Sequence, residues 1–179
     1  MLHDALYTRT LRETGASSAD TQSLRTLNRI LKSGEVRPSQ FHKDYDEAVC
    51  LTECTLPGIL SHAARYGRYG LIFRKADLRG SGCRPVATVT HEHLERLRKA
   101  ATTTELKEDC LYYNLYRPDG GTGPRQDYSH EREWRIRTAV PTSMAVAVIV
   151  ATPAKAAAVR KYSGDLPVLP LTLLYELGV

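Results

Sequence analysis

The segment SHEREWRI, residues 129–136, places carboxylates, arginines and a histidine around the only tryptophan of the chain. If this segment is a strand, alternation puts Glu133 and Arg135 on one face, and Trp134 and Ile136 on the other, as core residues. Two interpretations of the polar face are open. It is either an ion-pair ladder in solvent, in which each pair adds about 0–1 kcal/mol, or a site. In a site, Glu133 would stabilise positive charge that develops on a sugar.

Length, composition and charge restrict the class of protein. The 179 residues suit one domain, 1–179, and 42% apolar residues are enough for a core. The formal charge of +5 mildly favours an anionic partner such as DNA or RNA. There is no apolar run of about 18 residues, and MLHDALYTRT lacks a signal-peptide pattern. We therefore expect a cytoplasmic protein with no membrane contact.

Neither the cysteines nor the histidines predict a metal site. The absence of a C-x-x-C pair favours buried reduced thiols over disulfides or zinc ligands at Cys50, Cys54, Cys83 and Cys110. His91 and His93 flank Glu92, but residues two apart do not share a helix face. We therefore expect no metal.

Helices are predicted from the spacing of apolar residues, from capping residues and from terminal glycines. We expect one helix that Asp20 caps and Gly34 ends, and a second that begins at Thr55 and Pro57 and ends near Gly67. Three further helices are predicted: 91–100 with Thr90 as cap, 102–113 with a capping box at Thr102 and Glu105, and 153–162.

Strands are predicted where β-branched and apolar residues form short or alternating runs. Residues 35–47 and 115–129 are polar or rich in glycine and proline, so we expect loops there. LPVLPLTLL, residues 166–174, is expected to be extended, with its prolines at a sheet edge. The remaining predicted strands are 5–11, 48–52, 69–73, 84–90, 133–140 and 144–151.

The order of these elements does not repeat a regular β-α-β unit, so we predict a mixed α+β domain and not a doubly wound sheet. No G-x-G-x-x-G segment opens a helix after a strand, and there is no Walker-type loop. The GGTG segment at 120–123 falls in a predicted loop, and we interpret it as a flexible connection.

Several segments resemble the abortive-infection AbiGi family, which is tied to phage defence and includes a protein described as a putative antitoxin. The segments are AVCLTE, YGRYGLIFRK, RPVATV, HEREWRI, AVAVIVATPAKAAAVRKY and LPVLPL. The resemblance covers about residues 20 to 175, and E-R-E-W-R is its most distinctive piece. It implies a role in phage defence, with a cognate toxin or antitoxin as a partner.

The same order is similar, more distantly, to DarT-like ADP-ribosyltransferases, whose first helix has an ending like RILKSG. This resemblance implies an ADP-ribosyltransferase-like split sheet with peripheral helices. It also implies a catalytic glutamate on a late strand, at Glu133 or, as the alternative, Glu131. The first-strand contact to NAD⁺ falls on Thr8 and Arg9, where many relatives have histidine. The middle-strand position falls on Thr52 and its two neighbours.

The resemblance further implies that NAD⁺ is the substrate. Arg9 and Arg135 would bind its two phosphates, and Tyr66 or Tyr69 would stack on the nicotinamide. Glu133 would hydrogen-bond the ribose and stabilise the cationic transition state. The acceptor of ADP-ribose would be a nucleic acid, a protein or a small molecule. A simpler interpretation also stays open, in which the two tyrosines cover the core beside a turn and Arg9 lies on the surface.

Two functions from different classes are therefore open. A transferase would gather Arg9 and Tyr69 around Glu133. A non-catalytic antitoxin or nucleic-acid-binding regulator on the same fold would leave these residues dispersed. Three tyrosines could stack on bases of a nucleic acid: Tyr112, Tyr113 and Tyr116. In the structural interpretation, the same three tyrosines pack a helix end.

Overall fold

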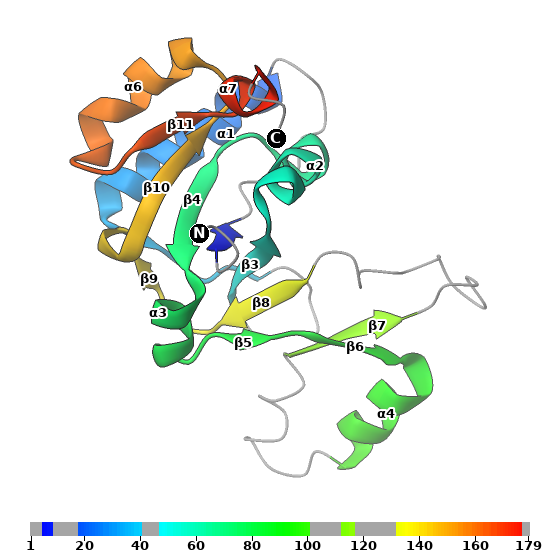
Figure 1. The fold of residues 1–179 in the computed structure, drawn as a ribbon. Helices are drawn as coiled ribbons and strands as arrows, with labels where there is room; N and C mark the ends of the chain where they lie inside the picture. Colours follow the sequence, from blue (N-terminus) through cyan, green and yellow to red (C-terminus); the bar gives the residue numbers. More distant parts are fainter. Residues whose placement is uncertain (1–4, 9–17, 41–46, 101–111, 117–131, 177–179) are drawn as a thin grey trace.

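The computed structural model describes residues 5–8, 18–40, 47–100, 112–116 and 132–176. In this part of the chain, a seven-stranded main sheet has the order β11-β10-β4-β1-β3-β8-β5 (Figure 1). The strands are β1 (Ala5–Thr8), β3 (Val49–Cys54), β4 (Gly70–Arg74), β5 (Arg84–Pro85), β8 (Glu133–Ile136), β10 (Ala145–Val150) and β11 (Val168–Pro170). Neighbouring strands are antiparallel except β10 and β11, which are parallel.

Two smaller sheets and a set of helices complete the described structure. The small sheets pair β2 (Glu35–Val36) with β9 (Val140–Pro141) and β6 (Ala87–Thr90) with β7 (Tyr113–Tyr116). The helices are α1 (Ser18–Ser33), α2 (Leu56–Tyr66), α3 (Lys75–Gly80), α4 (His91–Ala100), α6 (Pro153–Ser163) and α7 (Leu171–Glu176), with a 3-10 turn at Thr142–Met144. The predicted mixed α+β class is confirmed. Among the described helices, none has the length and apolar character needed to cross a membrane.

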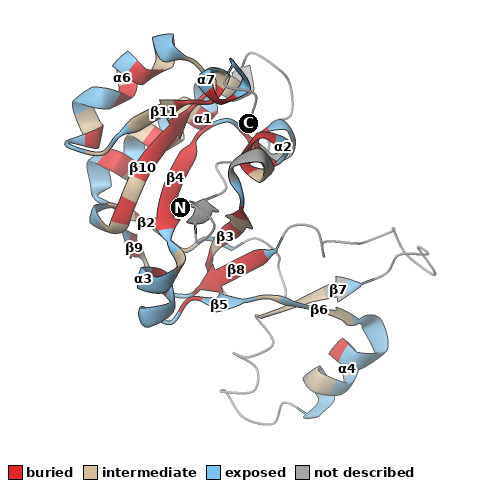
Figure 2. Ribbon diagram, viewed as in Figure 1, coloured by how far each residue is buried: buried red, intermediate tan, exposed pale blue. Residues whose placement is uncertain are grey.

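Helices cover both faces of the main sheet at β4 and β10, and this explains why these two strands are almost wholly apolar (Figure 2). On one face, α1 and α6 pack through Leu27, Leu31 and Val159 against side chains of β3, β4, β8 and β10. On the other face, α2 and α7 pack through Ile59 and Leu171 against further side chains of β4 and β10. Strands that are buried on both faces read as continuous apolar runs, as GLIF and AVAVIV do.

Several helix ends lie where local sequence signals predict them. The hydroxyl of Thr55 accepts a hydrogen bond from the backbone N–H of Gly58 at the start of α2. The hydroxyl of Thr90 accepts one from the N–H of His93 at the start of α4. Gly34 ends α1 with φ +76°, a conformation that favours glycine, and its N–H donates to the carbonyl of Ile30.

Several predictions from local sequence are wrong. Asp20 does not cap α1, which begins at Ser18, because its carboxylate accepts hydrogen bonds from the Tyr69 hydroxyl and the Arg68 guanidinium. The predicted strand 84–90 is two strands in different sheets, since β5 pairs with β8 and β6 pairs with β7. Residues 166–174 are extended only as far as Pro170, after which α7 begins.

The tyrosine-rich segment also differs from its prediction. Residues 113–116 form β7, whereas Tyr113 was expected to end a helix. This strand pairs in parallel with β6, with Ala87 opposite Tyr113 and Thr88 opposite Asn114. Parallel pairing joins segments that are distant in sequence, so the spacing of nearby apolar residues does not reveal it. The rest of the predicted helix, 102–111, lies outside the described residues.

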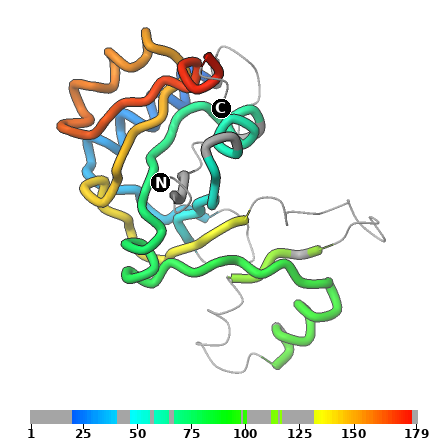
Figure 3. Tube along the Cα trace, in the orientation of Figure 1, coloured from blue at the N-terminus to red at the C-terminus, as the bar shows by residue number. Residues whose placement is uncertain are grey.

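The unit of β6, α4 and β7 is an insertion between β5 and β8 of the main sheet. The tube in Figure 3 shows the chain leaving the sheet at β5 to form β6 and α4. Leu94 of α4 is buried in this unit, whereas most of the helix surface is exposed. The insertion matters for function because β7 contributes Asn114 to the polar cluster on β8.

Candidate functional site

The centre of the candidate site is the pair of Glu133 and Arg135 on β8. The Arg135 Nε donates to Glu133 Oε1 at 3.1 Å, and Nη2 donates to Oε2 at 3.0 Å. Both residues are buried, with 6% of Glu133 and 2% of Arg135 exposed. Trp134 and Ile136 point into the core on the other face, which confirms the predicted alternation. The solvated ion-pair ladder is wrong, because the pair is shielded from water (Figure 2).

Asn114 of β7 closes this pair into a three-residue cluster. Its amide Nδ2 donates to Glu133 Oε2 at 2.7 Å, and its Oδ1 accepts from Arg135 Nη2 at 2.6 Å. The amide therefore contacts the carboxylate and the guanidinium at the same time. A buried ion pair is tolerated when its geometry is good and its remaining polar atoms are hydrogen-bonded, and Asn114 contributes to that condition.

Glu133 belongs to a row of residues that crosses three neighbouring strands. Thr52 of β3 pairs with Glu133 on one side and with Tyr7 of β1 on the other. Residues that pair across antiparallel strands lie on the same face of the sheet, here the face that α2 covers. The Thr52 hydroxyl lies 3.3 Å from Nε2 of His62 on α2, and both residues are buried. One face thus brings together a hydroxyl, an imidazole and a carboxylate.

A second carboxylate, Glu53, lies beside Thr52 in sequence but on the opposite face of the sheet. Its Oε1 accepts from Lys75 Nζ at 3.1 Å and from Arg132 Nη2 at 2.7 Å, and its Oε2 accepts from the Trp134 indole at 3.0 Å. Burial alone would raise the pKa of Glu53. The hydrogen bonds from Lys75 and Trp134 and the charges of Arg132 and Lys75 outweigh it, so its pKa is lowered and it stays ionised.

The structure brings some predicted site residues together and separates others. Thr52 and Arg135 lie with Glu133. Thr8 does not lie in the same row as Glu133, because it pairs with Leu51, which pairs with Trp134. The residue of β1 in the row of Glu133 is Tyr7.

Tyr69 also lies apart from Glu133. It is fully buried with the α1-side core, and its hydroxyl donates to Asp20 at 2.9 Å. Tyr66 is in α2, but its side chain, like Arg9 and Glu131, lies outside the described residues. The Arg135 guanidinium is engaged with Glu133 and Asn114, so we assign it to holding the carboxylate, whereas the sequence predicted a phosphate contact.

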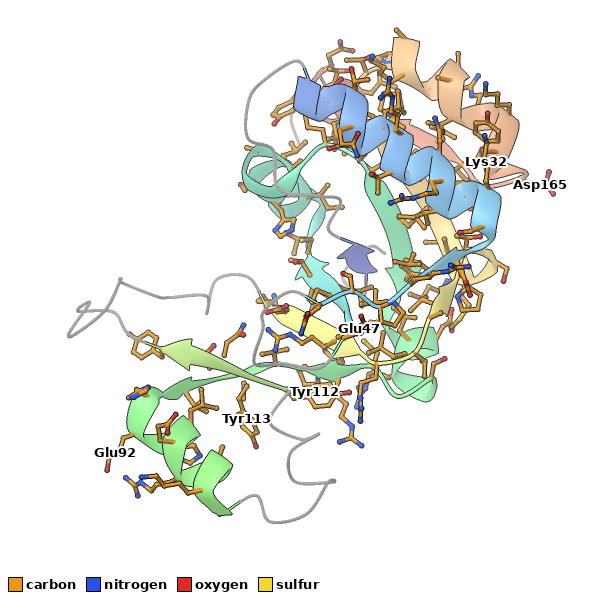
Figure 4. All side chains as sticks on the ribbon, turned by 180° about the vertical axis from the view of Figure 1, so that it is seen from behind. Lys32, Glu47, Glu92, Tyr112, Tyr113 and Asp165 are labelled. Atoms are coloured by element: carbon orange, nitrogen blue, oxygen red, sulfur yellow. The ribbon has the colours of Figure 1, made fainter. Side chains whose placement is uncertain are left out.

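Tyr113 and Tyr116 lie in β7 of the insertion, and Tyr112 immediately precedes that strand. Figure 4 shows Tyr112 near β5 and Tyr113 on the side of α4. The Arg84 guanidinium lies over the Tyr112 ring, 5.5 Å from its centroid. Tyr116 is exposed at 38%. An aromatic ring with a cation above it and an exposed aromatic ring are each groups that can contact bases or a protein surface.

Among the described cysteines, Cys54 and Cys83 are buried thiols and Cys50 is a partly buried thiol. Burial raises the pKa of Cys54 to about 11 and that of Cys83 to about 12, so both are neutral thiols near pH 7. Within the described ranges, no group of three or more His, Cys, Asp or Glu residues has the arrangement of a metal site. Cys110 lies outside those ranges.

Sequence reasoning missed two polar residues of this site, Asn114 and His62. His62 follows Ile59 by three residues on α2 and therefore shares its core-facing side, which was the available signal. Asn114 had no such signal, because the parallel strand that carries it was not predicted. Asn114 contacts Glu133 and Arg135, which are 19 and 21 positions away, whereas His62 contacts Thr52 at a separation of ten positions.

No family model matches this chain, and neither does any curated protein or solved structure.

Proposed function

We propose that the chain is an NAD⁺-dependent ADP-ribosyltransferase-like enzyme with Glu133 as its catalytic carboxylate. One observation carries the proposal. The resemblance assigns functional positions to a first, a middle and a late strand, and these are β1, β3 and β8, which are adjacent in the sheet. Tyr7, Thr52 and Glu133 form one row across them. The adjacency of these three strands supports the proposal. The first-strand position that the resemblance implies, Thr8, lies one row away, opposite Leu51, and Tyr7 stands in the row of Glu133.

The chemistry needs a fixed negative charge beside a sugar. The bond between nicotinamide and ribose C1′ breaks, nicotinamide leaves with the bonding electrons, and C1′ becomes cationic. An acceptor nucleophile then bonds to C1′ and loses its proton. Glu133 stabilises the cation and accepts a hydrogen bond from a ribose hydroxyl. Arg135 fixes the carboxylate before the reaction, and burial strengthens its field.

The other residues of this face have supporting roles in the proposal. The Thr52 hydroxyl, beside Glu133 in register, is a hydrogen-bonding group for the nicotinamide amide or the ribose. His62 orients that hydroxyl across 3.3 Å. Tyr69 has no role here, since it is buried with the α1-side core.

The test is release of nicotinamide from NAD⁺, with and without single-stranded DNA, tRNA and cell lysate. Glu133→Gln alone is a poor variant because it removes the carboxylate that pairs with the buried Arg135, and breaking a buried pair in this way costs about 3–5 kcal/mol. Glu133→Asp keeps the charge and withdraws it by one methylene group. The double variant Glu133→Gln with Arg135→Met removes both charges.

We expect release by the wild type and its loss in both variants, which remain folded by circular dichroism. The additive that stimulates release identifies the acceptor class. A folded wild type that neither binds NAD⁺ nor releases nicotinamide under any of these conditions refutes the proposal. The phage-defence role implied by the AbiGi resemblance belongs to the same proposal, and loss of protection in cells carrying Glu133→Asp would support it.

A second candidate is a non-catalytic antitoxin or nucleic-acid-binding regulator. The observation that favours it is that both Glu133 oxygens accept hydrogen bonds from Arg135 and Asn114, as in a structural ion pair that holds β7 on β8. The ring of Tyr112 under Arg84 and the exposed Tyr116 would then form the contact surface. Salt-dependent binding of single-stranded nucleic acid, lost in Tyr116→Ala, with no affinity for NAD⁺, would establish this function instead.

A further inference from the structure

Glu53 contacts both sequence neighbours of Glu133. Its carboxylate accepts from the Arg132 guanidinium at 2.7 Å and from the Trp134 indole at 3.0 Å. Its backbone N–H also donates to the Arg132 carbonyl at 3.1 Å. Residues 132 and 134 are therefore fixed to one residue of β3, and Glu133 lies between them with its side chain on the other face of the sheet.

Arg132 has a backbone conformation that needs such support. Its φ is +44°, the only positive value among the described residues that are not glycine. A left-handed conformation is unfavourable for an arginine, because its Cβ comes too close to the backbone. Two hydrogen bonds offset that cost: the Arg132 guanidinium donates to the Glu53 carboxylate, and the Glu53 backbone N–H donates to the Arg132 carbonyl. This turn sets the direction in which the chain enters β8, one residue before Glu133.

Glu53 is itself held firmly. Only 12% of its side chain is exposed, and Lys75 donates to it at 3.1 Å while lying 5.7 Å from the centroid of the Trp134 ring. The two cations and the indole hydrogen bond lower the pKa of Glu53, so the anchor stays charged at neutral pH. The anchor and the catalytic carboxylate are thus separate clusters on opposite faces of the same two strands.

We propose that Glu53 is a positioning residue for Glu133, acting through Arg132 and Trp134 without contact with the substrate. The catalytic part of this inference rests on the proposed function. Its structural part does not, because it states only that the Glu53 contacts fix the Glu133–Arg135 pair. When Glu53 loses its charge, β8 shifts at its start and Glu133 leaves its optimal position.

The experiment compares Glu53→Gln with the matched control Asp20→Asn. Asp20 is also a mostly buried carboxylate, 17% exposed, that accepts from a buried aromatic hydroxyl and an arginine, but on α1 and away from β8. A third variant, Trp134→Phe, replaces the indole with a smaller ring that has no N–H, and it keeps an aromatic side chain in the core. It decides the question if Glu53→Gln does not fold.

Two readouts separate positioning from general stability. The first is the NMR signal of the Arg135 Nε–H group, which donates directly to Glu133 and reports on that pair without any substrate. The second is the kinetics of nicotinamide release. We expect Glu53→Gln and Trp134→Phe to shift the Arg135 signal. We expect Glu53→Gln to lower kcat about 10- to 100-fold with KM within about twofold, because misplacing a catalytic group affects the transition state most. Asp20→Asn should change neither readout.

The outcomes for the two proposals are distinct. If the wild type releases no nicotinamide, the proposed function fails, and the Arg135 signal still decides whether Glu53 positions Glu133. If that signal is unchanged in Glu53→Gln, or in Trp134→Phe where Glu53→Gln is unfolded, the inference is overturned. It is also overturned if Asp20→Asn shifts the signal as much as Glu53→Gln does, because the effect would then be loss of stability alone.

Discussion

Replacing one member of the Glu133–Arg135 pair should destabilise the protein far more than replacing both. Glu133→Gln leaves a guanidinium that is 2% exposed beside a neutral amide, and Arg135→Met leaves a carboxylate with Asn114 as its remaining described hydrogen-bond partner. Breaking a buried pair costs about 3–5 kcal/mol because one buried charge loses its partner, whereas replacing both members by well-packed apolar residues of similar volume is often nearly neutral. The free energy of unfolding of the double variant should therefore lie within about 1–2 kcal/mol of the wild-type value.

Urea unfolding of the four proteins, a double-mutant cycle, measures the coupling. If the single effects simply added, the double variant would lose about 6–10 kcal/mol, so the expected coupling is several kcal/mol. Each single variant should lower Tm by about 6–20 °C, since 1 kcal/mol corresponds to about 2–4 °C in a protein of this size.

Glu92→Gln is the control, because the Glu92–Arg96 pair on α4 is also short, 2.6 Å, but over 70% exposed. Its loss should stay below about 0.5 kcal/mol. A loss of less than about 1 kcal/mol in both single variants at Glu133 and Arg135 would refute the reasoning, because that is the value of a solvated pair.

Two further predictions follow from shifted pKa values. The pKa of Glu53 is lowered on folding, so its contribution to the free energy of unfolding is complete above its unfolded value, 4.5, and is lost as pH falls through the folded pKa. The difference in unfolding free energy between wild type and Glu53→Gln should therefore shrink below pH 4.5, and a difference that stays constant from pH 7 to pH 3 would contradict this. Burial raises the pKa of Cys54 to about 11 and that of Cys83 to about 12, so iodoacetamide at pH 8 should label both slowly in the native protein and rapidly in guanidinium. Equal rates in the two states, measured by peptide mass spectrometry, would rule out the burial of these thiols.

Local sequence signals predicted much of the fold because they depend on neighbours within one turn or one strand. Thr55 and Thr90 have hydroxyls that cap α2 and α4, and Gly34 supplies the left-handed residue that ends α1. The alternation of Trp134 and Glu133 followed from strand geometry alone. Each of these features is a property of a few consecutive residues, so no knowledge of the rest of the chain was needed.

The parts that could not be predicted depend on contacts between distant segments. Strand alternation places Glu133 and Arg135 on one face whether that face meets solvent or protein. The sequence therefore could not predict that this pair is buried. Asn114 reaches Glu133 only because β7 pairs in parallel with β6, 26 positions earlier. Tyr69, predicted near the nicotinamide, instead donates to Asp20 on α1, a contact that spans 49 positions.

The concentration of charge around Trp134 has a physical explanation in these contacts. Four consecutive residues alternate between two carboxylate clusters: Arg132 and Trp134 donate to Glu53 on one face, and Glu133 and Arg135 pair on the other. A slip of β8 by one residue would put Glu133 and Arg135 into the apolar α1-side core and expel Trp134 from it, because every side chain would change face. The same slip would separate the indole from Glu53. The polar residues therefore define one register for β8, and that register alone places Glu133 opposite Thr52.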